Sequence, residues 1–170
     1  MILWTPPLFF PLSAVCGIFV FAMDDLQERL SKSIVLVFPP YLDGLVPIFT
    51  GAGFAIIHSH DPEVLEMEIK EFDPDLALEW QHGPQDYLIR DMIRKCKKEI
   101  PVFLTLNWNG RLPPNFSTLG YRDYVSCPWT IDGMMSKFYG VLPESKKPML
   151  KGIWERAKKR CGDGSETLAQ

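Results

Sequence analysis

From residue 32 onward, short apolar runs alternate with stretches whose apolar residues recur at helical spacing. Uninterrupted apolar runs rich in β-branched residues are typical of strands that are buried on both faces of a parallel sheet. Strands are predicted at 34–38, 54–58, 76–80, 100–106 and 124–127, and helices at 41–51, 62–72, 86–99 and 131–142. This alternation indicates an α/β fold with a flavodoxin-like, doubly wound, five-stranded parallel sheet. The right-handed crossover rule favours the strand order 2-1-3-4-5.

Local signals refine several of these elements. Pro47 lies inside the first predicted helix, so we expect it to kink that helix or delay its start. Asp61 is a good N-cap for the second helix, and Pro62 suits the first helical turn. Residues 107–119, between the last two strands, are rich in Pro, Gly and Asn. They predict a loop with one turn, so the fourth helix of the fold is expected to be reduced.

The last part of the chain, residues 143–170, is predicted to hold a linker, a short basic helix and a polar tail. The helix, expected at 149–159, has an apolar stripe formed by Leu150, Ile153, Trp154 and Ala157. Amphipathic stripes are usually contacts with a core, so we favour docking on the preceding domain. A partner-binding helix or a membrane-surface helix is the alternative.

Residues 1–22 form an apolar segment without a charged side chain. Its length is close to the roughly 20 residues that cross a bilayer, but three prolines weaken a helix in its first half. Three interpretations stay open. The segment is a membrane anchor with Arg29 and Lys32 on the cytoplasmic side, an apolar arm packed on the domain or on a partner, or an artefact of a start codon that really lies at Met23.

Composition narrows the possible functions. The 170 residues carry a formal net charge of -3, which argues against a general nucleic-acid-binding surface. The four cysteines are far apart and form no C-x-x-C pair, so neither structural zinc nor a redox dithiol is supported. Free thiols are typical of a reducing compartment. We therefore expect a cytoplasmic domain, with anchoring to the inner membrane as a further option through residues 1–22.

Five stretches, in order along the chain, resemble signature stretches of response-regulator receiver domains. Gly53–Phe54 resembles the family's Gly-Tyr after the first helix, and Asp73–Leu78 resembles P-D-L-V-L-L before the phosphorylation site. Pro84 corresponds to the proline of D-x-x-M-P, and Ile100–Thr105 is similar to P-V-I-x-L-T. Gly120–Trp129 resembles the last strand, G-A-D-D-Y-L-x-K-P-F.

The resemblance covers residues 33–142 and implies a receiver-like domain whose phosphoryl chemistry is missing. Receivers hold Mg²⁺ with an acidic pair after the first strand, and they carry an acceptor aspartate, a Ser/Thr and a lysine after the third, fourth and fifth strands. The carboxylates bind a hard cation and the lysine adds positive charge against the phosphoryl oxygens. Carried over residue by residue, these positions hold Phe38 and Pro39, Trp80, Leu106 and Cys127. A shift by one residue would instead give Pro39 and Pro40 for the pair and Thr105 for the Ser/Thr.

Glu79 is the carboxylate that a one-residue shift would bring to the acceptor position, where it could imitate a phosphorylated aspartate. Such a shift turns the side chain to the other face of the sheet and spoils the spacing to Pro84. Even in that register no acidic pair is present at residues 38–40. We therefore expect no aspartyl phosphorylation.

Other chemistry finds little support. His58 or His60 could bind a metal together with His82, and Cys127 could approach from the fifth strand, but the spacing of a metal motif is absent. Nothing pairs Cys127 with a base, as a nucleophile would require. We expect no metal, no cofactor and no enzymatic activity.

Aromatic residues gather near the expected carboxyl edge of the sheet. The simpler interpretation is that they fill the space left by the acidic pocket; they are Phe38, Trp80, Trp108, Tyr124 and Trp129. The alternative is that Trp108, Tyr124 and Trp129 form a partner-binding surface, because aromatic side chains often anchor interfaces.

The sequence thus predicts a phosphorylation-independent receiver-like interaction module in bacterial signal transduction, with a protein partner. One alternative is a small-molecule-binding flavodoxin-like domain, since 34–40 and 69–75 also resemble the cobalamin-binding region of some radical enzymes, although the D-x-H-x-x-G signature is absent. A second is an atypical phospho-regulated receiver that uses Glu79.

Overall fold

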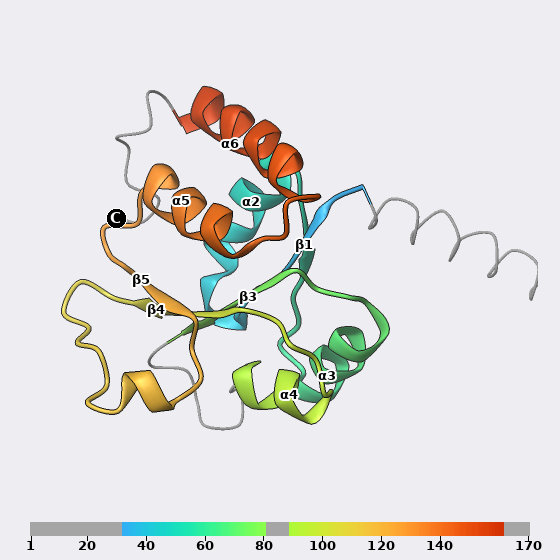
Figure 1. The fold of residues 1–170 in the computed structure, drawn as a ribbon, viewed down its shortest axis with the longest axis vertical. Coiled ribbons are helices and arrows are strands. Elements are labelled where there is room, and N and C mark those ends of the chain that lie inside the picture. The colour runs from blue at the N-terminus through green and yellow to red at the C-terminus, as the bar shows by residue number, and fades with distance from the viewer. Residues whose placement is uncertain (1–31, 81–88, 162–170) are drawn as a thin grey trace, which may run out of the picture. The chain divides into compact units, whose positions relative to one another are not determined.

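A parallel sheet organises the chain, and the computed structural model describes residues 32–80 and 89–161. Within these residues the sheet has five strands in the order β2-β1-β3-β4-β5, which confirms the predicted topology (Figure 1). The strands are β1 (Ile34–Val37), β2 (Phe54–Ile57), β3 (Leu76–Trp80), β4 (Val102–Leu106) and β5 (Asp123–Ser126). Every strand begins within two residues of its predicted start. The first four are dominated by apolar residues, whereas β5 begins with Asp123 and ends with Ser126.

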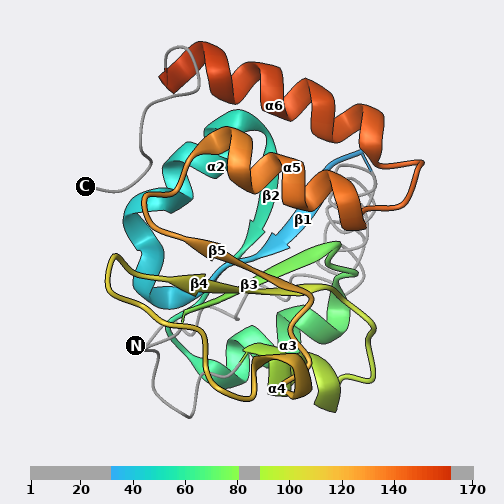
Figure 2. The ribbon, with the colours of Figure 1, turned by 60° about the vertical axis from the view of Figure 1, so that its left-hand side comes forward.

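Helices cover both faces of the sheet, as a doubly wound fold requires. The first face is covered by α2 (Val46–Ala52) and α5 (Ile131–Val141), with α6 (Lys147–Cys161) packed on both of them (Figures 1 and 2). The second face is covered by α3 (Pro62–Glu71) and α4 (Ile89–Lys95). Successive residues of a strand therefore point into different cores.

The core under α2, α5 and α6 is rich in aromatic side chains. The Phe138 ring lies 5.2 Å from that of Phe103 on β4 and 6.3 Å from that of Phe54 on β2, measured between centroids. All three side chains are buried. These edge-on contacts join α5 to two strands that are not neighbours in the sheet, so the packing of this face depends on the whole sheet being formed.

In the connection from β1 to β2, the α-helix starts later than predicted. A 3₁₀ segment, η1 (Pro40–Leu45), comes first, and α2 then starts at Val46. Pro47 thus lies in the first turn of α2, where its missing N–H costs nothing. This confirms that the proline delays the helix. Asp61 caps α3 as predicted, since its side chain accepts the backbone N–H groups of Glu63 and Val64.

The helical parts of two other connections are short. The helix predicted at 86–99 is described from Ile89 and ends at Lys95, shortly before Lys97 adopts a left-handed conformation with φ 54°. Residues 86–88 lie outside the described residues. Between β4 and β5 there is a single 3₁₀ turn, η3 (Phe116–Thr118). The reduced fourth helix is therefore confirmed.

The basic helix α6 is docked on the domain by the apolar stripe seen in the sequence. Leu150, Ile153 and Ala157 are buried in the core beneath it. At its margin the Trp154 indole N–H donates to Asp132 Oδ1 at 2.6 Å. Among residues 32–80 and 89–161 no helix combines the length and the hydropathy that a bilayer span requires. The predictions for residues 1–22 and for the polar tail after Cys161 fall outside the described residues.

Candidate functional site

Apolar side chains occupy the edge of the sheet where the resemblance places a magnesium site. Phe38 directly follows β1 and is completely buried, with its ring centroid 5.3 Å from that of Phe49. Pro39 is also buried and leads into η1. Neither residue offers an oxygen ligand from its side chain, so a hard cation would find no carboxylate at these two positions.

Two indoles meet at the ends of β3 and β5. The rings of Trp80 and Trp129 are nearly perpendicular, with centroids 5.7 Å apart. The Trp129 Nε1–H donates to the Leu106 carbonyl at 3.1 Å, and the backbone N–H of Cys127 donates to the same oxygen at 3.1 Å. Trp80, Leu106 and Cys127, which the resemblance aligns with the acceptor, the Ser/Thr and the lysine, are thus joined by backbone hydrogen bonding and ring packing around Trp129.

Cys127 supplies no positive charge to this cluster. Its side chain is partly buried against the apolar core. Burial raises the pKa of its thiol above the ordinary value, so the group is a neutral thiol at neutral pH. A neutral thiol offers no electrostatic attraction to an anion such as a phosphoryl group.

Thr105, the residue that a shift of the resemblance by one position would give for the Ser/Thr, has its hydroxyl engaged inside the sheet. Its side chain is 1% exposed, and its hydroxyl donates to the Glu79 backbone carbonyl at 2.8 Å. The β3–β4 register pairs it with Trp80. The hydroxyl is therefore part of the packing between two strands and is not presented at the open edge.

Glu79 points away from the aromatic cluster, toward the face covered by α4. Its carboxylate is buried and accepts the Arg90 backbone N–H at 2.9 Å and the Tyr121 hydroxyl. Burial raises the pKa of Glu79 despite these two hydrogen bonds, which favour the charged form. Glu79 and Trp80 lie on opposite faces, as strand geometry requires. The carboxylate therefore faces the α4 core and not the edge at which an acceptor would stand.

The three predicted partner-binding aromatics are not equally accessible. Trp108 is 61% exposed. Tyr124 is half-buried between Phe116, 5.9 Å away, and Lys137, whose Nζ lies 4.7 Å from the ring centroid. Trp129, in contrast, is 2% exposed and belongs to the core. The alternative that Trp129 forms part of a partner-binding surface is therefore wrong, and its burial agrees with the simpler interpretation that it fills space. Any aromatic surface here rests on Trp108 and Tyr124.

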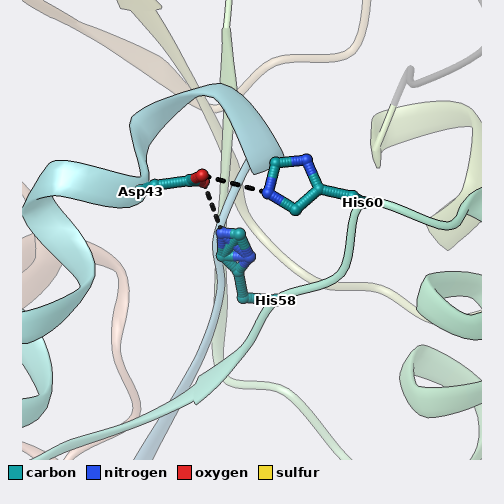
Figure 3. Close-up of side chains that lie close together, drawn as sticks. All are labelled: Asp43, His58 and His60. Atoms are coloured by element: carbon teal, nitrogen blue, oxygen red, sulfur yellow. Dashed lines mark hydrogen bonds and ion pairs between the residues drawn. The ribbon is translucent and has the colours of Figure 1, made fainter.

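Polar residues converge at another point of the carboxyl edge. His58 and His60 follow β2, and both turn toward Asp43 of η1 (Figure 3). His58 Nε2 lies 2.8 Å from Asp43 Oδ1, and His60 Nε2 lies 3.0 Å from Asp43 Oδ2. Burial lowers the pKa of His58, which favours its neutral form. Each carboxylate oxygen thus contacts a different imidazole.

His58, His60 and His82 were candidate metal ligands from the sequence, whereas Asp43 was not among the candidates. His82 lies outside the described residues. Asp43 precedes His58 by 15 positions, within the segment predicted as a helix that Pro47 kinks or delays. The usable signal was its place just after β1, because the carboxyl ends of β1 and β2 are neighbours in this strand order. Tyr121 was missed for a similar reason, since its bond to Glu79 spans 42 residues.

Comparison with solved structures places this fold beside receiver domains. The N-terminal domain of the nisin resistance regulator NsrR, a lantibiotic response regulator, superposes with a TM-score of 0.54 at 18% identity, over 65% of this chain and 98% of that one. A signal receiver domain from Bacteroides fragilis superposes with a TM-score of 0.51 at 14% identity, covering 66% and 98%. The receiver domain of the TMAO respiratory regulator TorR gives 0.50 at 16% identity, covering 63% and 94%. At such identities the likeness concerns the fold.

No protein-family model matches the sequence, and no curated protein matches it. The structure therefore defines this chain as an α/β protein with the receiver, flavodoxin-like fold.

Proposed function

We propose that this chain is a receiver-like interaction module that works without phosphorylation and is not an enzyme. The observation that carries the proposal is the apolar filling of the edge at which a receiver reacts. Phe38 and Trp129 are buried there, and Trp80 packs edge-on against Trp129. Phosphoryl transfer needs a bound cation, an acceptor carboxylate and a compensating positive charge. The residues at the corresponding positions supply none of these from their side chains.

The role left to such a domain is recognition of a protein partner in signal transduction. Trp108 supports this role, because a large aromatic side chain that is 61% exposed is suited to anchor an interface. Leu112, in the same β4–β5 connection, is 38% exposed. Since only a 3₁₀ turn stands where receivers carry a fourth helix, the partner would meet a surface of different shape.

Binding of a small molecule at this edge has weaker support. Ligands of open α/β sheets bind outside the carboxyl ends of the strands. In this chain Phe38 and Trp129 fill that region with side chains that are 0% and 2% exposed. A cobalamin-like ligand would reveal itself by visible absorbance that stays with the purified protein, and such a finding would replace the proposal.

The direct test is an amide NMR titration of the full chain with Mg²⁺ and beryllofluoride, a mimic of aspartyl phosphate. We expect the resonances around Trp80, Leu106 and Cys127 to stay in place at millimolar concentrations of both. A receiver domain with its acidic pair, aspartate and lysine intact, titrated in parallel, confirms that the reagent is active.

Concerted shifts around Glu79, Thr105 and Cys127 at micromolar beryllofluoride would overturn the proposal. They would show an atypical phospho-regulated domain. In that case the Glu79→Gln chain identifies the acceptor, because it would lose the response if Glu79 were responsible.

A further inference from the structure

The cluster of Asp43, His58 and His60 has the composition of a transition-metal site. One ligand atom from each residue can be chosen so that all three lie within 4.8 Å of one another. On a tetrahedral Zn²⁺ with bonds of about 2.0–2.1 Å, neighbouring ligand atoms stand roughly 3.3 Å apart. The three side chains therefore need to move by only small amounts to surround one ion.

We propose that Asp43, His58 and His60 bind one divalent transition-metal ion of the zinc class, and that the ion joins the carboxyl ends of β1 and β2. Two imidazoles and one carboxylate are a ligand set found around Zn²⁺ and similar ions. Figure 3 shows both imidazoles turned toward the single carboxylate, which comes from a different connection of the chain. The donors thus come from two connections of the chain, the one after β1 and the one after β2, and all three could contact the same ion.

The donor set selects the class of metal. Mg²⁺ and Ca²⁺ are hard cations that prefer oxygen ligands, and a site with two nitrogen donors suits them poorly. The site is also separate from the magnesium position of the receiver resemblance, which corresponds to Phe38 and Pro39. The inference is therefore independent of the proposed loss of phosphorylation.

The accessibility of the cluster suits exchange with solvent. The side chains of Asp43 and His60 are 57% and 65% exposed, whereas that of His58 is 16% exposed. An ion held by three protein ligands would keep at least one position for water or for a donor from another molecule. The less exposed side chain of His58 would stay in place, and the side chains of Asp43 and His60 would move toward the ion.

Binding has a structural consequence that can be measured. Asp43 lies in η1, which links β1 to α2, and the two histidines lie between β2 and α3. A shared ion would cross-link these two connections in the folded chain. Because an ion that binds the folded form stabilises it by mass action, Tm is expected to rise with metal concentration.

The test uses the full chain, freed of metal by a chelator, with Zn²⁺ followed by calorimetry and Co²⁺ followed by visible absorption. We expect one ion per chain and a Co²⁺ spectrum typical of nitrogen and oxygen ligands. Long-range ¹H–¹⁵N spectra are expected to show coordination through the Nε2 atoms of two histidines. The His60→Ala and Asp43→Ala chains should bind at least roughly tenfold more weakly, since each loses one of three ligands.

The matched control is His82→Ala, which removes the chain's remaining histidine and is expected to leave the affinity within about twofold of the original. His60 is the most exposed ligand, so its variant should keep the amide NMR spectrum of the folded chain. Thiolate-to-cobalt charge-transfer bands would overturn the proposal, because they would assign the metal to cysteines. Absence of Zn²⁺ binding up to 100 μM, or an equal loss in His82→Ala, would overturn it as well.

Discussion

The indole of Trp80 meets that of Trp129 edge-on, with ring centroids 5.7 Å apart, at one edge of the parallel sheet. Trp80 ends β3, and Trp129 follows β5, so the contact spans the ends of two strands separated by β4. Such a perpendicular pair adds about 0.5–1.5 kcal/mol beyond the burial of its area. Aromatic packing therefore contributes to the stability of this edge of the sheet.

Trp129→Phe is expected to lower the free energy of unfolding by about 1–3 kcal/mol. The change reduces the area of the aromatic contact with Trp80. It also removes the Nε1–H that donates to the Leu106 carbonyl at 3.1 Å. Equilibrium unfolding in urea measures the loss. The matched control is Trp108→Phe, because Trp108 is 61% exposed. That variant should stay within about 0.5 kcal/mol of the original chain, and an equal loss in both would contradict the distinction between core and surface tryptophans.

Restoring the lysine of the receiver pattern alone should not restore its chemistry. Cys127→Lys places an ammonium beside an apolar cluster, so we expect a loss of about 1–2 kcal/mol in the free energy of unfolding. No response to Mg²⁺ and beryllofluoride should appear in amide NMR, since on the proposed function Phe38 and Trp80 stand where the resemblance would require carboxylates. Cys127→Ala serves as the control for loss of the thiol. Binding of beryllofluoride by the lysine variant would show that a single residue had silenced the site.

The sequence predicted the sheet well because its information is local. The first four strands are short segments dominated by apolar residues, and Asp61 caps α3 as its position before Pro62 indicates. The reduced helix before β5 could also be predicted, because the Pro and Gly content of this connection excludes a long helix. The stripe on α6 likewise predicted docking, although the helix proved longer at both ends than expected.

The polar contacts could not be predicted in the same way, because they join residues far apart in the chain. The Glu79 side chain meets Tyr121 from a distant connection, and Asp43 meets two histidines that follow another strand. Strand order brings their backbones close, but the direction of each side chain depends on tertiary packing. Trp129 illustrates the same difficulty. It lies just after the end of β5 and is buried, but the residues around it in the sequence do not show whether it belongs to the core or to the surface.

Glu79 should make the stability of this domain depend on pH. Because burial raises its pKa in the folded chain, the folded state holds a proton that the unfolded state releases above the ordinary value of 4.5. The contribution is fully present below pH 4.5 and is lost as the pH rises through the higher folded pKa. In Glu79→Gln this slope should disappear. The measurement is the difference in free energy of unfolding between the two chains from about pH 4 to pH 8, the range that brackets such a shift.

Tyr121→Phe provides the companion experiment for the same carboxylate. The Tyr121 hydroxyl donates to Glu79 and thereby favours the charged form, opposing the effect of burial. Removing the hydroxyl should raise the Glu79 pKa further, so the loss of stability should extend to higher pH. Glu68, whose pKa burial also raises, is unchanged in all three chains and cancels in the comparison. A pH profile shared by the original chain and Glu79→Gln would refute the assignment.

Gly53→Ala is expected to lower the free energy of unfolding by about 2 kcal/mol. Gly53 ends α2 with φ 112°, a conformation that side chains with a Cβ rarely adopt. An added Cβ would also lie 2.6 Å from Arg156 Nη2 of α6. To relieve this contact Arg156 must move, and its Nε would lose the hydrogen bond to the Ala52 carbonyl, now 2.9 Å long. The variant therefore weakens both the end of α2 and the docking of α6.

A double-mutant cycle with Arg156→Ala separates the backbone strain from the contact with α6. If the guanidinium contributes, the two substitutions together should cost less than the sum of their separate losses, because the clash vanishes with the arginine. Gly140→Ala within α5 is the matched control, since a Cβ there would meet no atom within 4 Å. Alanine favours a helix over glycine by about 0.8–1.0 kcal/mol, so this control should be neutral or stabilising. Strict additivity in the cycle would confine the effect to the backbone of Gly53 and would exclude α6 from it.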